Sequence, residues 1–212
     1  MLTDEQAWEA REKKLNRQLM VYLIIALALF PAQSTAHVLR TITAGLRHLW
    51  PQPVERLATQ SALSTRRRQL GEQPLQTLCS RVVHPIATAQ TTGAFRFGRL
   101  LVAVDSTVDN VPDTAANRAA FGYSKPGDFH SPYPQVRCVY LAECGTHVIF
   151  AATFTPCRTS ELEGASLLLE QHLTHNMLLL WDRGFRDSAL FRLVRAKGAH
   201  VLGRLAAGHL TR

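Results

Sequence analysis

The sequence predicts an α/β protein in which a helical N-terminal domain (residues 1–95) precedes a mixed β-sheet with flanking helices (residues 96–212). Two observations favour this fold class. Apolar side chains recur at helical spacing through the first part, and short apolar runs typical of buried strands appear at 100–104 and 177–181 in the second. With 212 residues, 46% of them hydrophobic, the chain can form a sizeable core together with a small accessory domain.

The N-terminal part is expected to be a series of helices. Thr3 can cap a first helix that continues to Arg17. The apolar stretch 19–30 is shorter than the roughly 20 residues that a membrane-spanning helix needs, so we expect a buried core helix. A signal peptide is the alternative, but acidic residues are mixed with basic ones in front of this stretch. Cap residues, apolar spacing and glycine or proline stops predict further helices at 34–49, 61–70 and 74–83.

The C-terminal part is expected to alternate between strands and helices. The strand at 100–104 ends at Asp105, and the polar residues 109–134 lack sustained periodicity, which predicts a long loop. Ser160 and Glu163 have the spacing of a capping box, which indicates the start of a helix. The other predicted elements are strands at 136–142, 147–154, 177–181 and 200–205 and a helix at 187–197. This is the order of a ribonuclease-H-like core, incomplete at its C-terminal end.

The charge of the chain indicates a polyanionic partner. The formal net charge is +8 and the pI about 9.9, which favours nucleic acid. Arg66, Arg67 and Arg68 form a run that could contact phosphates, although a solvated helix face explains the run equally well. The four cysteines contain no C-x-x-C pair, so we expect no zinc site, and scattered cysteines are typical of reduced thiols in a cytoplasmic protein.

Two aspartates follow apolar strands in the same way. Asp105 comes directly after the run 100–104, and Asp182 comes after 177–181, shortly before a glycine that allows a tight turn. If the two strands are neighbours, their carboxyl ends meet at one edge of the sheet and the carboxylates converge. Converging carboxylates are typical ligands of a hard divalent cation such as Mg²⁺.

Several motifs together resemble the DDE transposases of the insertion-sequence-4 group. Residues 104–107 (Val-Asp-Ser-Thr) are similar to the first-acid motif, in which glycine usually stands where this chain has Ser106. Residues 182–185 (Asp-Arg-Gly-Phe) match the second-acid motif closely. The helical front, residues 61–71 above all, resembles the domain that often precedes this core. Further matches to the family are Pro112-Asp113-Thr114, Asn117, Phe121-Gly122 and Arg204 at the end of a strand.

The resemblance implies metal-dependent phosphoryl transfer on DNA ends. Asp105 and Asp182 would be the catalytic and metal-binding acids of a two-Mg²⁺ site. The implied partner is double-stranded DNA that carries the terminal repeats of the element, and a homodimer is left open as the assembly. No membrane association is expected. The candidate DNA-binding residues are Arg66, Arg67, Arg68, Arg183 and Arg204.

The chain is expected to lack the third acid of that site. The family takes it from a glutamate on a helix well beyond the second aspartate, whereas Asp187 is the only acidic residue after Asp182. We therefore expect a truncated transposase with an incomplete two-metal site, inactive as given. The alternatives are a non-catalytic DNA-binding fragment and a metal-dependent nuclease of the same fold. A phosphatase of the haloacid-dehalogenase type is disfavoured, because Thr107 stands where its second aspartate would be.

Other candidate ligands fit ordinary structural roles better. Asp109 and Asp113 flank the first acid, but loop aspartates usually cap turns. His172 and His175 lie three residues apart on a predicted helix, a spacing that metal sites use. Because no carboxylate or cysteine joins them in a recognised pattern, surface histidines are the simpler interpretation.

Overall fold

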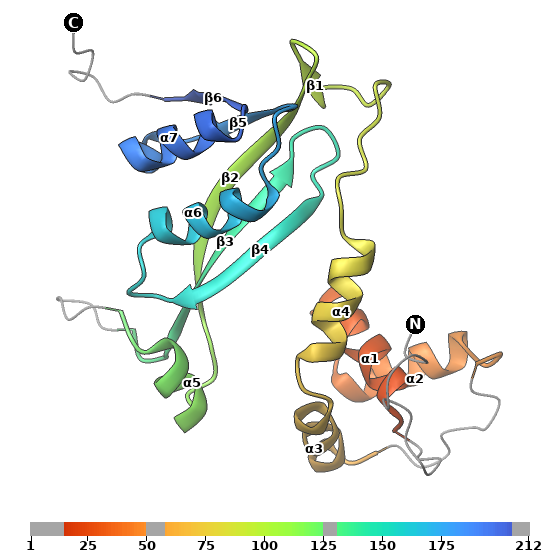
Figure 1. The fold of residues 1–212 in the computed structure, drawn as a ribbon. Helices are drawn as coiled ribbons and strands as arrows, with labels where there is room; N and C mark the ends of the chain where they lie inside the picture. Colours follow the sequence, from red (N-terminus) through yellow and green to blue (C-terminus); the bar gives the residue numbers. More distant parts are fainter. Residues whose placement is uncertain (1–14, 50–57, 125–130, 205–212) are drawn as a thin grey trace, which may run out of the picture. The chain divides into compact units, whose positions relative to one another are not determined.

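A computed structural model describes residues 15–49, 58–124 and 131–204 (Figure 1). The chain divides into two compact units, Met1–Val82 and Val83–Arg212. This division falls earlier than the boundary at residue 95 that the sequence suggested, because the segment after Val82 is bound to the sheet of the second unit. The buried carboxylate of Glu143 accepts hydrogen bonds from the backbone N–H groups of Ile86 (3.2 Å) and Ala87 (2.9 Å).

The first unit consists of short helices packed around α1. Helix α1 (Arg17–Leu29) contacts α2 (Thr35–Gly45) and α3 (Gln60–Leu70), and α4 (Gln73–Val82) follows α3 in the chain. Each of the first three helices begins at a capping side chain that accepts a hydrogen bond from the backbone N–H three residues further on. These caps are Asn16, Ser34 and Thr59. The core side chains include Leu19, Met20, Leu23, Val38, Leu39 and Leu63.

The apolar stretch at 19–30 forms most of α1, and the prediction of a buried core helix is confirmed. The side chains of Leu19 and Leu23 are each only 1% exposed. No helix among the described residues combines the length and the apolar character needed to cross a membrane. The first helix predicted from Thr3 lies almost wholly outside the described residues; within them, Asn16 caps α1 immediately before Arg17.

The second unit is built on a six-stranded mixed sheet (Figure 1). Its main strands lie in the order β4-β3-β2-β5-β6, and a two-residue strand, β1 (Phe95–Arg96), pairs with the start of β2. Strand β2 pairs antiparallel with β3 and parallel with β5. This is the predicted ribonuclease-H-like topology, a three-stranded meander followed by parallel strands. The main strands are β2 (Arg99–Asn110), β3 (Gln135–Glu143), β4 (Ile149–Pro156), β5 (Met177–Trp181) and β6 (His200–Gly203).

Helices α6 (Glu161–His172) and α7 (Ser188–Ala196) contact each other, and α6 packs on β3 and β4. The predicted cap of α6 is confirmed, since the hydroxyl of Ser160 accepts a hydrogen bond from the backbone N–H of Glu163 (3.2 Å). Gly164 permits the close packing of α6, because a Cβ atom there would lie 2.6 Å from Cγ2 of the buried Val139. Buried residues of this core include Val102, Val104, Leu141, Leu168, Leu169 and Leu179.

Two predictions for the chain after Asp105 are wrong. Strand β2 continues from Asp105 to Asn110, because β3 pairs with it along this whole stretch and Gln135 lies opposite Asn110. The predicted loop at 109–134 contains a short helix, α5 (Ala115–Phe121). Thr114 caps its start, and it ends at Gly122, whose φ of 68° favours glycine. Residues 125–130 of that predicted loop lie outside the described residues.

Candidate active site

The pairing of β2 with β5 places the two predicted acids at equivalent positions. The parallel register sets Ala103 opposite Leu180, so the same register, continued by two residues, sets Asp105 opposite Asp182. Asp182 follows Trp181, the last residue of β5, so this register brings the backbones of the two aspartates to the same edge of the sheet. Both aspartates are exposed to solvent. The pairing therefore brings two solvent-accessible aspartates to one edge of the sheet.

Asp105 lies inside a strand, and both of its carboxylate oxygens have partners. The backbone N–H of Ser106 donates to Oδ1 (2.8 Å), and the hydroxyl of Tyr140 donates to Oδ2 (3.3 Å). Tyr140 lies directly opposite Asp105 on β3. Burial, the charge of Asp105 and this hydrogen bond together raise the pKa of Tyr140. Nothing in the sequence singles out Tyr140; the antiparallel register identifies it.

Asp182 begins a tight turn at the end of β5. Its Oδ1 accepts a hydrogen bond from the backbone N–H of Gly184 (2.7 Å) and so caps the 3-10 turn η1 (Arg183–Phe185). Phe185 is 1% exposed and anchors this turn in the core. Among the described residues no hydrogen bond reaches Oδ2 of Asp182, so the cap leaves one carboxylate oxygen available to a ligand.

A third carboxylate, Glu161, lies near Asp182 and was missed by sequence reasoning. Glu161 is the first residue of α6, and its Oε2 accepts a hydrogen bond from the hydroxyl of Ser106 (2.8 Å). Its Oε1 and Oδ1 of Asp182 both lie 2.9 Å from the point where a Cβ atom on Gly184 would stand, so these oxygens are at most twice that distance apart. The sequence feature that could have identified Glu161 is the capping serine directly before it, because that serine marks Glu161 as the first residue of a helix.

The site fits a divalent cation in part. Carboxylate oxygens are the ligands that Mg²⁺ prefers, and no ion pair joins Asp105, Glu161 or Asp182 to a cationic side chain within the described part of the chain. Yet within those residues no group of three or more His, Cys, Asp or Glu side chains is arranged to hold a metal ion. Neither His172 nor His175 therefore belongs to such a group.

Two other aspartates have structural roles. Asp113 forms an ion pair with Arg118 (3.0 Å) and accepts a hydrogen bond from the hydroxyl of Tyr123 (3.0 Å). Asp187 caps α7 by accepting from the backbone N–H groups of Ala189 (2.7 Å) and Leu190 (3.1 Å). Both carboxylates are thus occupied by contacts that hold their own segments.

The four cysteines are free thiols. Burial raises the pKa of Cys144, and burial together with the charge of Asp109 raises that of Cys138. A raised thiol pKa lowers the thiolate fraction, and the thiolate is the form that binds metal ions and attacks electrophiles. Burial therefore makes Cys138 and Cys144 weaker nucleophiles and metal ligands than an exposed thiol.

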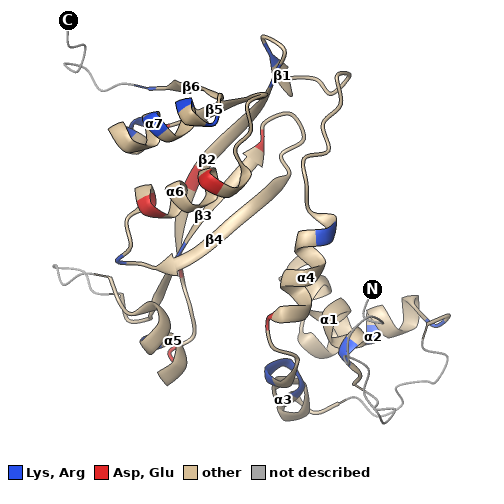
Figure 2. Ribbon diagram, in the orientation of Figure 1, with Lys and Arg blue, Asp and Glu red and all other residues tan. Residues whose placement is uncertain are grey.

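The predicted DNA-binding arginines differ in their surroundings. Arg66 is half-buried: its Nε donates to the carbonyl of Leu15 (2.8 Å) and its Nη1 to Oε1 of Gln69 (2.8 Å), so it holds the first unit together. Arg67 and Arg68 are exposed in the last turn of α3, where Figure 2 shows a gathering of basic residues. Arg183 and Arg204 are exposed in the second unit.

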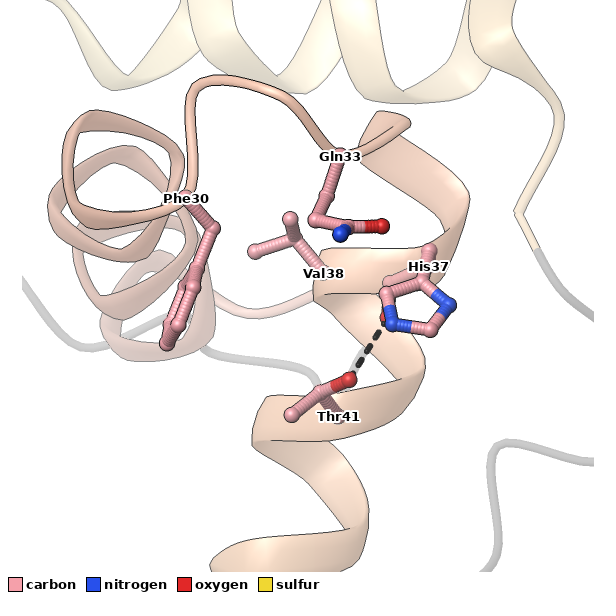
Figure 3. A pocket seen from close by; sticks show the side chains of 5 residues that line it. All are labelled: Phe30, Gln33, His37, Val38 and Thr41. Atoms are coloured by element: carbon pink, nitrogen blue, oxygen red, sulfur yellow. Dashed lines mark hydrogen bonds between the residues drawn. The ribbon is translucent and has the colours of Figure 1, made fainter.

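The first unit also contains a small hollow of about 180 Å³ beside α2 (Figure 3). It is lined by Phe30, Gln33, His37, Val38 and Thr41. The Thr41 hydroxyl donates to the backbone carbonyl of His37 (3.1 Å), so its hydrogen bond stays within α2. None of the predicted site residues lines this hollow, so it takes no part in the candidate active site.

Family models match both units of the chain. "Insertion element 4 transposase N-terminal" matches residues 1–80, and "Transposase DDE domain" matches residues 96–211. Together the two models cover most of the sequence, and the chain belongs to the DDE transposases of the insertion-sequence-4 family.

The chain is similar to two proteins of Escherichia coli strain K12. It is 27% identical over 190 residues to "Transposase InsG for insertion sequence element IS4". The aligned region covers 90% of this chain and 41% of that relative. It is 28% identical over 151 residues to "Putative transposase InsZ", and this aligned region covers 68% of this chain and 48% of that relative. The chain thus spans less than half the length of these relatives.

Solved structures of transposases resemble the chain more distantly. A piggyBac transposase synaptic complex with hairpin DNA matches with a TM-score of 0.44 and 11% identity, over 99% of this chain and 46% of that one. A pre-cleavage Mos1 transpososome matches with a TM-score of 0.35 and 13% identity, over 94% of this chain and 63% of that one.

Proposed function

We propose that this chain carries the DNA-binding front and two catalytic acids of a transposase that moves an insertion sequence by phosphoryl transfer on DNA ends. The observation that supports the proposal is the parallel pairing of β2 with β5, which sets Ala103, two residues before Asp105, opposite Leu180, two residues before Asp182. One similar protein is named as a transposase for insertion sequence element IS4, and the other is named as a putative transposase.

The two aspartates would hold divalent ions, with Mg²⁺ the expected metal. Bound there, such ions would activate the attacking water or 3′-hydroxyl and stabilise the leaving oxygen. The contribution of this chain is to orient the ligands. The Ser106 N–H and the Tyr140 hydroxyl fix the carboxylate of Asp105, and the Gly184 N–H fixes that of Asp182. Fixed ligands need little rearrangement when the metal binds.

We propose that the partner is double-stranded DNA with the terminal repeats of the element. The net charge of +8 and the exposed Arg67 and Arg68 support this partner. Arg183 is placed next to Asp182, where it could contact a phosphate near the reacting bond. One related structure is titled as a transposase complex with hairpin DNA. A second copy of the chain would bring the two ends of the element together.

A non-catalytic DNA-binding role is the second candidate for the 212-residue chain. It is favoured by the position of Asp187, the one acid after Asp182, which caps α7 and so does not supply the family's third carboxylate. We expect this chain to bind DNA ends and Mg²⁺ weakly, and not to complete transposition by itself.

The test is a strand-cleavage assay with Mg²⁺ or Mn²⁺ on DNA that carries the element's ends, next to DNA of scrambled sequence. Binding of the end DNA without cleavage is the expected result. Robust cleavage that is lost in Asp105→Asn would instead show a complete active site. Equal cleavage of both DNAs would favour a metal-dependent nuclease.

A further inference from the structure

Ser106 stands where the first-acid motif of the family usually has glycine. Its hydroxyl forms hydrogen bonds with two side chains. The hydroxyl donates to Oε2 of Glu161 (2.8 Å) and accepts from Nη1 of Arg137 (3.3 Å). The Nε of Arg137 donates to the backbone carbonyl of Thr159 (3.0 Å), just before α6. Ser106 therefore connects β2 with β3 and with the first residue of α6, which a glycine could not do.

The same serine also holds the first acid. Its backbone N–H donates to Oδ1 of Asp105 (2.8 Å) and, together with the Tyr140 hydroxyl at Oδ2, holds the orientation of that carboxylate. Its side chain lies on the face of the sheet that α6 covers, because Ser106 pairs with the buried Val139, against which Gly164 of α6 packs. Glu161 and Asp105 therefore lie on opposite faces of the sheet, and Ser106 is hydrogen-bonded to both of them.

The second oxygen of Glu161 lies close to the second acid. Oε1 of Glu161 and Oδ1 of Asp182 each lie 2.9 Å from the position that a Cβ atom on Gly184 would occupy. Like charges at such a separation repel each other, and no cationic side chain forms an ion pair with either of them among the described residues. A divalent cation on the aspartates would relieve this repulsion, so the charge of Glu161 favours its binding.

We propose that Glu161 is a positioning residue of the candidate active site: it orients Asp105 through the Ser106 hydroxyl and adds negative charge beside Asp182, and so tightens divalent-cation binding by the two aspartates. The proposal rests on the proposed function, since it assumes that Asp105 and Asp182 bind the cation. Partners that orient metal ligands typically change metal affinity by about 10- to 100-fold when they are removed.

The test measures Mn²⁺ binding to the full 212-residue chain by electron paramagnetic resonance of the free ion. Glu161→Ala and Ser106→Ala are each expected to weaken binding roughly tenfold. The double variant should bind like Glu161→Ala alone, because both changes break the same connection. Glu163→Ala is the matched control: it removes the same charge from the same first turn of α6, and its exposed side chain should leave affinity within about twofold.

Hydrogen exchange of the Ser106 amide provides a second measurement that needs no metal. Glu161→Gln keeps an oxygen that accepts from the serine hydroxyl, so the amide should stay protected, whereas Glu161→Ala should expose it. If Glu161→Ala matches Glu163→Ala in both measurements, the positioning role is wrong while the proposed function stands. If Asp105→Asn and Asp182→Asn also leave Mn²⁺ binding unchanged, or if the chain binds no Mn²⁺, the metal site and the positioning role are both wrong.

Discussion

Tyr140 and Asp105 face each other across β2 and β3, and this contact predicts how the tyrosine titrates. In Asp105→Asn the charge and the hydrogen bond to a carboxylate are lost, so the pKa of Tyr140 should fall toward its ordinary value of 10.0. Burial is the largest cause of the shift, so part of it should remain. A phenolate titration by NMR, with Tyr140→Phe to assign the signal, measures both effects. An unchanged pKa in Asp105→Asn would contradict the contact.

The raised pKa of Tyr140 also has a consequence for stability. A group whose pKa is higher in the folded state binds more protons folded than unfolded between the two pKa values. The stability that depends on neutral Tyr140 is therefore present below about pH 10 and is lost as pH rises through the raised pKa. Tyr140→Phe should lose less stability than the parent chain over this alkaline range, as measured by urea unfolding at several pH values.

Asp187 tests the assignment of an acid to a structural role. Because its carboxylate caps α7, Asp187→Ala should lower the free energy of unfolding by about 1 kcal/mol. Asp187→Asn, which retains a capping oxygen, should lose much less. Mn²⁺ affinity should stay unchanged in both variants. A loss of metal binding with intact stability would move Asp187 into the active site.

At the scale of elements, the fit of α6 on the sheet depends on Gly164. A Cβ atom in Gly164→Ala would lie 2.6 Å from Val139, so we expect a loss of about 1–3 kcal/mol despite the better helix propensity of alanine. Val139→Ala in the same chain should recover part of that loss by making room. Gly45→Ala in α2 is the control, since its added Cβ meets nothing within 4 Å. Thermal unfolding of the four chains separates these outcomes.

Sequence patterns predicted most of these elements because their signals are local. Apolar periodicity, capping residues and glycine stops identified α1, α3 and α6, and apolar runs identified β2 and β5. The patterns failed after Asp105, where β2 continues through polar residues because β3 pairs with them. Helix α5 was missed because its short length gives no periodicity, although Thr114 and Gly122 mark both of its ends.

The candidate site was predictable to the same degree. Asp105 and Asp182 follow apolar runs, so each could be found from its own stretch of sequence. Tyr140 and Glu161 lie far from Asp105 in sequence and reach the site only through strand pairing and helix packing. Their roles depend on register and on contacts across the sheet, which no local pattern encodes.

At the scale of the whole molecule, the arginines of α3 should divide into two kinds. Arg67→Ala and Arg68→Ala should each weaken DNA binding and reduce the salt dependence of the logarithm of affinity by about 0.9 per lost phosphate contact. Arg66→Ala should chiefly lower stability, because its guanidinium holds the carbonyl of Leu15. Fluorescence anisotropy at several salt concentrations, with thermal unfolding alongside, distinguishes the two. A salt dependence that survives Arg67→Ala and Arg68→Ala combined would place the DNA elsewhere.

The continuation of β2 beyond Asp105 lowers the conformational-entropy cost of binding a ligand to this residue. A carboxylate on a loop must be immobilised when its ligand binds, and fixing the backbone of one residue costs about 1–2 kcal/mol. Asp105 has strand residues on both sides, and β3 pairs with all of them from Val102 to Asn110. Its backbone is immobilised during folding, so ligand binding does not bear that cost. Asp182 begins a turn instead, and its backbone is held in place by the buried side chain of Phe185 in that turn.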